Sequence, residues 1–308
     1  MISRLKNYGL ELRAAFLSAT IVSIILGTAI AYAQFRVFNL EFFALSLVAG
    51  AFLHLGTNVA NDYFDHKSGG DEINKEYVRP FSGGSRMIQL GLLSPREVLF
   101  EAAFLYAVGI VMGLYVASIR GFFVIVLGLI GLFSGVFYVG PPFKLANRGV
   151  GEILVGINFG ILMTIGAYFV QAQTMNVDPI TASIPVALLI FAVVYINEFL
   201  DYTADKTIGK NTLVVRLGRK KAAQGFVVLM SLVYLLIAIG VAVKIMPLPT
   251  LIGLITLPIA AKAVYNTLKN YSNPVKLVPS NASTILCHLL TSLLLSTGYL
   301  ITILIIAK

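Results

Sequence analysis

The sequence predicts an all-α, polytopic membrane protein with about nine transmembrane helices. Of its 308 residues, 58% are hydrophobic and only 12% are charged, which is more apolar than a soluble domain needs. Uncharged runs long enough, or nearly so, to cross a bilayer recur about nine times. Only helices satisfy their own backbone hydrogen bonds in lipid over such lengths. No long polar linker separates the runs, so residues 1–308 are predicted to form a single domain.

The predicted spans follow one another along the whole chain. They are residues 14–35, 42–61, 102–119, 121–143, 153–177, 179–197, 222–243, 245–261 and 277–307. The third helix is expected to begin earlier, because Ser94 suits an N-cap, Pro95 the first turn and Glu97 the positive end of the helix dipole. The first run also resembles a signal peptide, but it is longer than a usual signal core and many spans follow it.

The Lys and Arg residues predict the orientation of these spans. With the N-terminus inside, nineteen of the 23 basic residues fall in inner segments, and only Arg36, Arg120, Lys244 and Lys308 fall outside. This bias places the N-terminus in the cytoplasm and the C-terminus outside the cell membrane. The second and sixth helices then both end at the cytoplasmic face.

The second run leads into an acidic stretch that contains Asn58, Asp62, Asp65 and Asp71. On a helix, the first three of these residues are spaced i, i+4, i+7 and share one face. A charged side chain at membrane depth costs roughly 2.5–3.5 kcal/mol on insertion scales, so such a group is expected to have a partner.

The sixth run leads into a second acidic stretch of the same form, with Asn197, Asp201 and Asp205 spaced i, i+4, i+8. Asn197 and Asp201 each follow their counterparts in the first stretch by 139 residues. This constant offset predicts a parallel pseudo-repeat of helices 2–5 and 6–9. The alternative is two unrelated polar helix ends.

Amide and carboxylate oxygens are hard ligands suited to Mg²⁺, which binds one or two carboxylates together with the phosphate oxygens of a substrate. Two such half-sites that face one another predict a metal-bound diphosphate. The predicted metal ligands are Asn58, Asp62, Asp65, Asn197, Asp201 and Asp205. The predicted catalytic carboxylates are Asp62, Asp65, Asp71, Asp201 and Asp205. The alternative is a solvated interface in which these acids pair with nearby lysines.

Basic and aromatic residues in the inner loops are predicted to bind the diphosphate: Arg79, Arg86, Tyr138, Lys144 and Lys210. Arg79 and Arg86 flank a glycine pair, and glycine lets a backbone approach an anion that Arg can clamp. Lys144 follows the Pro141-Pro142 break, which is expected to end the fourth helix. Each basic residue, taken singly, could instead serve only to set the orientation of the spans in the membrane.

These motifs resemble those of the UbiA-type intramembrane prenyltransferases, over nearly the whole chain. The resemblance rests on the stretch 58–71, the segment 138–144, and Asp201 and Asp205 followed by residues 209–218. It implies nine transmembrane helices around a central cavity and two Mg²⁺ ions that bridge an isoprenyl diphosphate. It also implies prenyl transfer to an aromatic ring or to a lipid hydroxyl such as that of geranylgeranylglyceryl phosphate. Residues 65–71 and 83–85 are most similar to the menaquinone branch, whose acceptor is 1,4-dihydroxy-2-naphthoate. The family's commoner first motif has an acid where this chain has His66, which leaves open whether Asp65 or Asp71 completes the first metal site.

Other classes of function are weighed against this one. A cation-coupled secondary transporter also combines parallel repeats with intramembrane acids, but it usually holds them near the bilayer midplane. The net charge of +9 lies in loops at one membrane face and does not indicate nucleic acid. The single Cys287 excludes an internal disulfide, and the three His residues form no spaced ligand pair. Prenyl chain length, acceptor and oligomeric state stay open.

Overall fold

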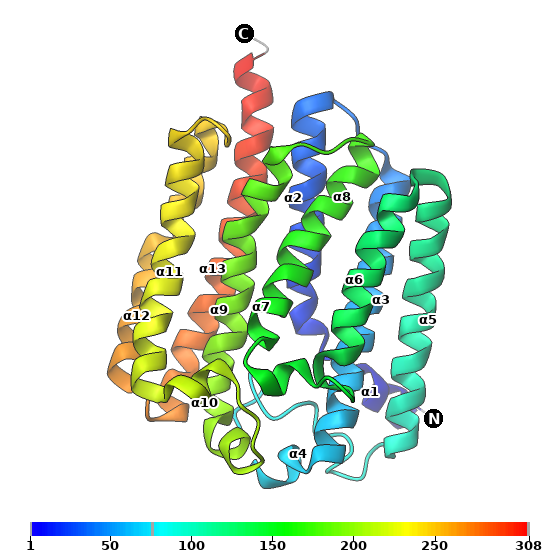
Figure 1. Cartoon of the computed structure of the whole chain (residues 1–308), viewed down its shortest axis with the longest axis vertical. Helices are drawn as coiled ribbons and strands as arrows, with labels where there is room; N and C mark the ends of the chain where they lie inside the picture. Colours follow the sequence, from blue (N-terminus) through cyan, green and yellow to red (C-terminus); the bar gives the residue numbers. More distant parts are fainter. Residues whose placement is uncertain (1, 75–76, 307–308) are drawn as a thin grey trace.

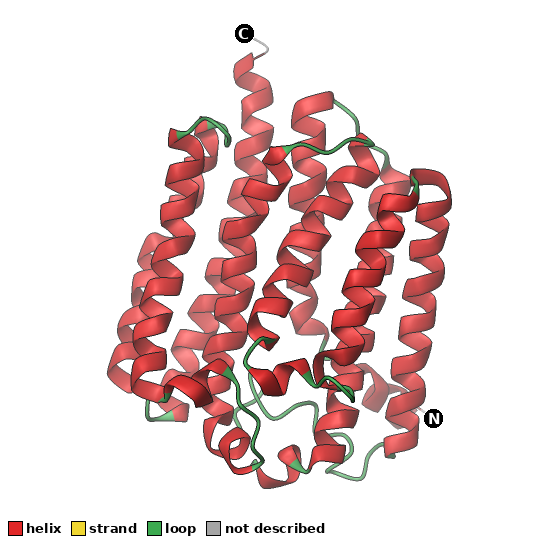
Figure 2. Cartoon of the chain, viewed as in Figure 1, coloured by secondary structure: helices red, strands yellow, loops and turns green. Residues whose placement is uncertain are grey.

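The computed structural model describes residues 2–74 and 77–306, and every regular element in those ranges is a helix (Figure 2). Nine helices in this described part are long and apolar enough to cross a membrane, as the sequence predicted. Lys75 and Lys308, which were counted in the charge bias, lie outside the described residues.

The spans have the following bounds. They are η1 and α2 (Ala14–Leu17 and Ser18–Phe35), α3 (Leu40–Ser68), α5 (Pro95–Arg120), α6 (Phe122–Val139), α7 with η3 and α8 (Gly151–Val155, Gly156–Leu162 and Met163–Ala172), α9 (Val177–Thr207), α11 (Arg219–Ala242), η4 with α12 (Leu248–Thr256 and Leu257–Asn270) and α13 (Pro274–Ile306). Short helices complete the fold: α1 (Ile2–Glu11), α4 (Gly70–Ile73), η2 (Leu145–Arg148) and α10 (Leu213–Leu217).

Two predicted boundaries can be compared with the structure in detail. The third span begins at Pro95 with the full capping box, since Ser94 accepts from the backbone of Glu97 and the Glu97 side chain accepts from that of Ser94. The second and sixth spans are longer than predicted, because α3 continues to Ser68 and α9 to Thr207. A search for uncharged runs stops at the first acidic residue, whereas the helical hydrogen bonds continue through it.

The helices α3 and α9 end on the same side of the molecule (Figure 1). The short helices α1, α4 and α10 also lie at this end, and the C-terminus lies at the other. Helix α9 is the central one, because 61% of its most apolar window is buried, against 11% for α6, which faces outward. The two acidic stretches therefore meet at one end of the bundle, although the parallel pseudo-repeat itself stays a prediction.

The fifth span changes its helical type where it crosses the middle of the bundle. Gly156–Leu162 form a π-helix between α7 and α8. A Cβ atom on Gly160 would lie 2.4 Å from the Cα of Ala187, so this segment packs directly against the backbone of α9. Interruptions of an α-helix by π-helical turns are frequent at functional sites.

Candidate functional site

A cavity of about 530 Å³ lies inside the bundle, a volume suited to a small-molecule ligand. Its walls come from η1, α2, α3, α4, α5, α6, α7, η3, α8, α9 and α13, and from the loops that follow α4 and α9. One end is rich in oxygen donors, where α3 and α9 finish. The remainder is mostly apolar, with walls that include Ile24, Leu53, Ile110, Leu114, Val124, Leu127, Leu132, Leu162, Met163, Val170 and Ile190.

The first acidic stretch contributes Asn58, Asp65 and Asp71 to the cavity wall, but not Asp62. The Asp62 carboxylate is buried beside the cavity, on the same side of α3, where neighbouring groups cover it. Its Oδ2 accepts a hydrogen bond from the backbone nitrogen of Ser85 at 2.8 Å, and its Oδ1 lies 3.4 Å from Arg13 Nη1. Asp62 thus joins α3 to the loop that follows α4 and to the start of the first span.

The glycine pair in that loop passes between two of the carboxylates. Gly84 has a φ of 66°, and a Cβ there would lie 2.9 Å from Asp62 Oδ1 and 3.4 Å from Asp71 Oδ2. Glycine allows both the positive φ and the close approach. The loop is held in place by its own arginines, since Arg79 donates to the Ser85 carbonyl at 2.6 Å and Arg86 donates to the Asp71 carbonyl.

The second acidic stretch lines the cavity with all three of its predicted residues. Asn197 Oδ1 accepts from the Asn281 side chain at 2.7 Å, and Asp201 Oδ1 accepts from the Asn74 side chain at 2.6 Å. Asp205 forms an ion pair with Lys210 at 3.6 Å. These partners hold the oxygen donors of α9 in place at the end of the cavity.

Of the five predicted diphosphate-binding residues, the structure brings only Tyr138 and Lys210 to the cavity. Arg79 and Arg86 lie outside its wall because their guanidinium groups brace the glycine loop; Arg86 also stacks over the Tyr77 ring at 4.4 Å. Lys144 is exposed and outside the cavity wall; it precedes η2 in a left-handed backbone conformation, with φ at 46°.

Sequence reasoning missed four residues that line the same end: Arg13, Asn61, Asn74 and Glu198. Asn61 and Glu198 lie within the two motifs, each next to a predicted ligand in the sequence. Their polar side chains at membrane depth could have indicated that they belong to the site. Arg13 was counted only as a topology signal. The loop residue Asn74 carried no signal in the sequence.

The acidic end of the cavity has more acidic than basic side chains. Five carboxyl groups line it (Asp65, Asp71, Glu198, Asp201 and Asp205), against the two cations Arg13 and Lys210. Burial raises the pKa of Asp71 to about 8, and repulsion from Asp65 and Asp62 adds to this effect. Burial lowers the pKa of Lys210, but attraction to Asp205 and Asp65 outweighs it and raises that pKa well above its ordinary value. This end therefore favours a bound cation.

The donor set suits a hard divalent cation that brings a phosphate ligand with it. Every donor from the two motifs is an amide or carboxylate oxygen, and the buried Glu198 Oε2 has no partner among the described residues. In the described part of the chain, no three His, Cys, Asp or Glu side chains form a ready-made metal cluster. Mg²⁺ fits this arrangement, because it usually binds one or two carboxylates and completes its shell with water and substrate phosphates.

Known proteins resemble this chain over most of its length. The UbiA prenyltransferase family model matches residues 20–277. A 1,4-dihydroxy-2-naphthoate octaprenyltransferase of Bacillus subtilis is 28% identical over 93% of this chain and 89% of its own length. A 2-carboxy-1,4-naphthoquinone phytyltransferase of Synechocystis is 28% identical over 92% and 89%.

Among solved structures, a UbiA homolog from Archaeoglobus fulgidus bound to DMAPP and Mg²⁺ has a TM-score of 0.72 at 15% identity, covering 96% of this chain and 99% of that one. This likeness shows that the two chains share a fold. The family match covers most of the sequence, so the chain belongs to the UbiA prenyltransferase family and is an intramembrane prenyltransferase.

Proposed function

We propose that the protein transfers an isoprenyl group from a prenyl diphosphate to an aromatic quinone precursor, in a reaction that depends on Mg²⁺. This proposal rests on one observation: the acidic, oxygen-rich end and the apolar interior belong to one continuous cavity. A prenyl diphosphate has the complementary form, an anionic head that binds metal and a hydrocarbon tail. The naphthalene-ring chemistry in the names of the Bacillus and Synechocystis relatives supports 1,4-dihydroxy-2-naphthoate as the acceptor over a lipid hydroxyl.

In this proposal the two acidic stretches hold the cation from either side of the diphosphate. The predicted ligands that line the cavity are Asn58, Asp65, Asn197, Asp201 and Asp205, and two ions are expected. A Mg²⁺ ion held by these oxygens would supply positive charge to offset the negative charge that develops on the diphosphate as the carbon–oxygen bond breaks. Asp62 supports the same site indirectly, because it holds in place the glycine loop that borders Asp71.

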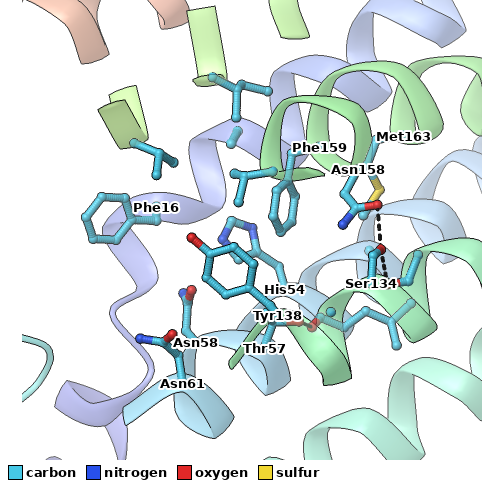
Figure 3. Close-up of a pocket in the computed structure, with 18 of the residues that line it drawn as sticks. Phe16, His54, Thr57, Asn58, Asn61, Ser134, Tyr138, Asn158, Phe159 and Met163 are labelled. Carbon is cyan, nitrogen blue, oxygen red and sulfur yellow. Dashed lines mark hydrogen bonds between the residues drawn. The ribbon is translucent and has the colours of Figure 1, made fainter. Parts of the chain in front are cut away.

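The remaining lining residues bind, orient and protect the substrate. Lys210 and Arg13 provide donors for diphosphate oxygens at the acidic end. The apolar wall holds the tail and excludes water, which would otherwise quench an allylic cation. Tyr138 lies between the acidic end and the interior, where its ring face stabilises positive charge on the departing prenyl group (Figure 3).

A cation-coupled transporter is less well supported by the same geometry. Its coupling-ion site is expected near the middle of the bilayer. Here Asp201 and Asp205 lie in the last turns of α9, which ends at Thr207, and Asp65 lies one turn before the end of α3. Acids at helix ends beside basic loops suit a phosphate ligand.

We expect the acidic end to face the cytoplasm of a bacterial-type plasma membrane, because the basic residues gather there. Cysteines placed at Glu72 and Lys220, both exposed at this end, should react with an impermeant maleimide only from the cytoplasmic side. A cysteine at Val177, exposed at the other end, should react only from outside. Background should be low, because the single native Cys287 is buried. Labelling of Glu72 and Lys220 from opposite sides would contradict the proposed orientation.

The proposed activity has a direct test with purified protein in detergent. Mg²⁺ and labelled geranylgeranyl diphosphate should yield a prenylated product with 1,4-dihydroxy-2-naphthoate, and EDTA should abolish product formation. At a concentration 100 times its Kd, the diphosphate should stabilise the fold by about 2.7 kcal/mol, and only when Mg²⁺ is present. A panel with 4-hydroxybenzoate and geranylgeranylglyceryl phosphate compares the acceptor classes. Turnover on the glycerol phosphate alone would assign the lipid branch instead.

A further inference from the structure

The face of α3 that carries the first acidic stretch continues into the membrane interior with a histidine. His54 precedes Asn58 by four residues, so it lies on the same helix face, about 6 Å deeper at 1.5 Å per residue. Both residues line the cavity. A buried polar ring at this depth stands out, because most of the surrounding cavity wall is apolar.

His54 is held in one orientation by two neighbours. Its Nδ1 hydrogen-bonds Thr20 Oγ1 at 2.8 Å, and its ring stacks against Phe159 with centroids 4.1 Å apart. The residue is only 5% exposed, and no described residue bonds its Nε2. His54 thus presents one ring nitrogen to the cavity and keeps it there.

A second polar group belongs to the same wall. Asn158 and Phe159 lie on the π-helical segment, and both line the cavity. Ser134 on α6 donates to Asn158 Oδ1 at 2.9 Å, and the Asn158 Nδ2, for which no described residue is an acceptor, points toward His54 and Phe159 (Figure 3). The π segment therefore places an amide donor beside an aromatic ring, next to the histidine.

On α9 itself the wall has no such group, although His288 of α13 also lines the cavity. The position that matches His54 in the second stretch, 139 residues later, is Val193, and it also lines the cavity. One turn beyond the metal-binding asparagines, the cavity is therefore polar on the α3 side and apolar on the α9 side. A prenyl group bound through its diphosphate would have its first carbons at this depth. The acceptor must therefore approach those carbons here.

We propose that His54 Nε2, Asn158 Nδ2 and the Phe159 ring form the binding subsite for the oxygen-bearing aromatic acceptor, with the prenyl chain against Val193. The assignment rests on the proposed function. The ring of a hydroxylated naphthoate stacks beside Phe159, while its oxygen substituents pair with the two nitrogens. Hydrogen bonds to fixed polar groups discriminate strongly against analogues that lack the matching oxygen, whereas an apolar wall selects only weakly.

The test separates the KM of the acceptor from the KM of the prenyl diphosphate. His54→Phe keeps a ring against Phe159 but removes the nitrogen, and Asn158→Leu removes the amide at similar size. Each should raise the KM for 1,4-dihydroxy-2-naphthoate by about tenfold, the effect of one lost hydrogen bond that leaves a polar partner unpaired, with the diphosphate KM within about twofold of wild type. His54→Gln, which keeps a polar group, should recover much of the loss. Val193→Leu should show the opposite split and raise the KM of the prenyl diphosphate.

Each variant is first checked for a Mg²⁺-dependent thermal shift with geranylgeranyl diphosphate, which reports a folded diphosphate site. If His54→Phe does not fold, His54→Gln and Asn158→Leu decide the question. An unchanged acceptor KM in the folded variants, or equal changes for both substrates, overturns the assignment while the proposed function stands. A wild-type protein that prenylates no aromatic acceptor overturns the proposed function, and the assignment with it.

Discussion

Asp201→Ala is expected to abolish prenyl transfer while the protein still folds in the membrane. Asp201 lines the cavity in the middle of the second stretch, and the Asn74 side chain holds one of its oxygens at 2.6 Å. Its removal deletes an anionic ligand from the proposed Mg²⁺ site. Metal stabilisation of charge in the transition state amounts to several kcal/mol, so kcat/KM should fall by about 10³-fold or more.

Helix α9 also offers a matched control for this variant. Asp178 is an acid in the first turn of the same helix, at its other end and away from the cavity lining. Asp178→Asn should therefore retain wild-type turnover. Initial rates with saturating Mg²⁺ give the turnover of both variants, and size-exclusion profiles show whether they are folded. Near-normal turnover by Asp201→Ala would rule out a metal site formed by both acidic stretches.

The first stretch leads to a different expectation for its central acid. Asp62→Ala should also eliminate activity, but with a lower unfolding temperature, because the buried carboxylate holds the Ser85 backbone and lies beside Arg13. Breaking a buried pair by the removal of one partner typically costs 3–5 kcal/mol. A loss of activity with unchanged stability would indicate that Asp62 turns into the cavity to bind the metal itself.

Much of the fold could be predicted because membrane burial imposes few alternatives. A helix satisfies all its backbone hydrogen bonds within one segment, so long uncharged runs in lipid predicted nine helical spans. The Ser94 and Glu97 pattern located the start of one of them. The charge bias put the ends of α3 and α9 on one side, where the structure has them. The ends of these helices were missed, because charged residues stop a hydropathy run without stopping a helix.

The site was harder to predict, because helical spacing assigns a face but not the loop that packs on it. Asp62 shares a face with Asn58 by spacing, yet the Ser85 backbone nitrogen and Arg13 occupy its carboxylate. Arg79 and Arg86 bind carbonyl groups of their own loop, which no spacing rule anticipates. Arg13 and Asn74 reach the cavity from distant parts of the chain, and only the tertiary structure brings them there.

The two lysines predicted to bind diphosphate occupy different positions in the structure. Lys210 lines the cavity, and its ammonium lies 3.6 Å from Asp205 with a side chain that is 18% exposed. Lys144 is exposed beyond the cavity wall. A lysine that lines the acidic end can bond a diphosphate oxygen that the metal leaves free, whereas an exposed lysine at the membrane face extends its charge into water.

Lys210→Met should therefore weaken prenyl diphosphate binding strongly, and Lys144→Met should not. Methionine keeps an apolar chain of similar length and deletes the charge in both cases. The loss at Lys210 should be about 1.5–3 kcal/mol, the range for hydrogen bonds to charged groups, which corresponds to roughly 10- to 150-fold in Kd. Titration of each variant with a thiodiphosphate analogue in the presence of Mg²⁺ measures this directly. Because the lost lysine also leaves Asp205 without its partner, the unfolding temperature without ligand is recorded alongside. Equal dissociation constants for the two variants would contradict the prediction that Lys210, and not Lys144, binds the diphosphate.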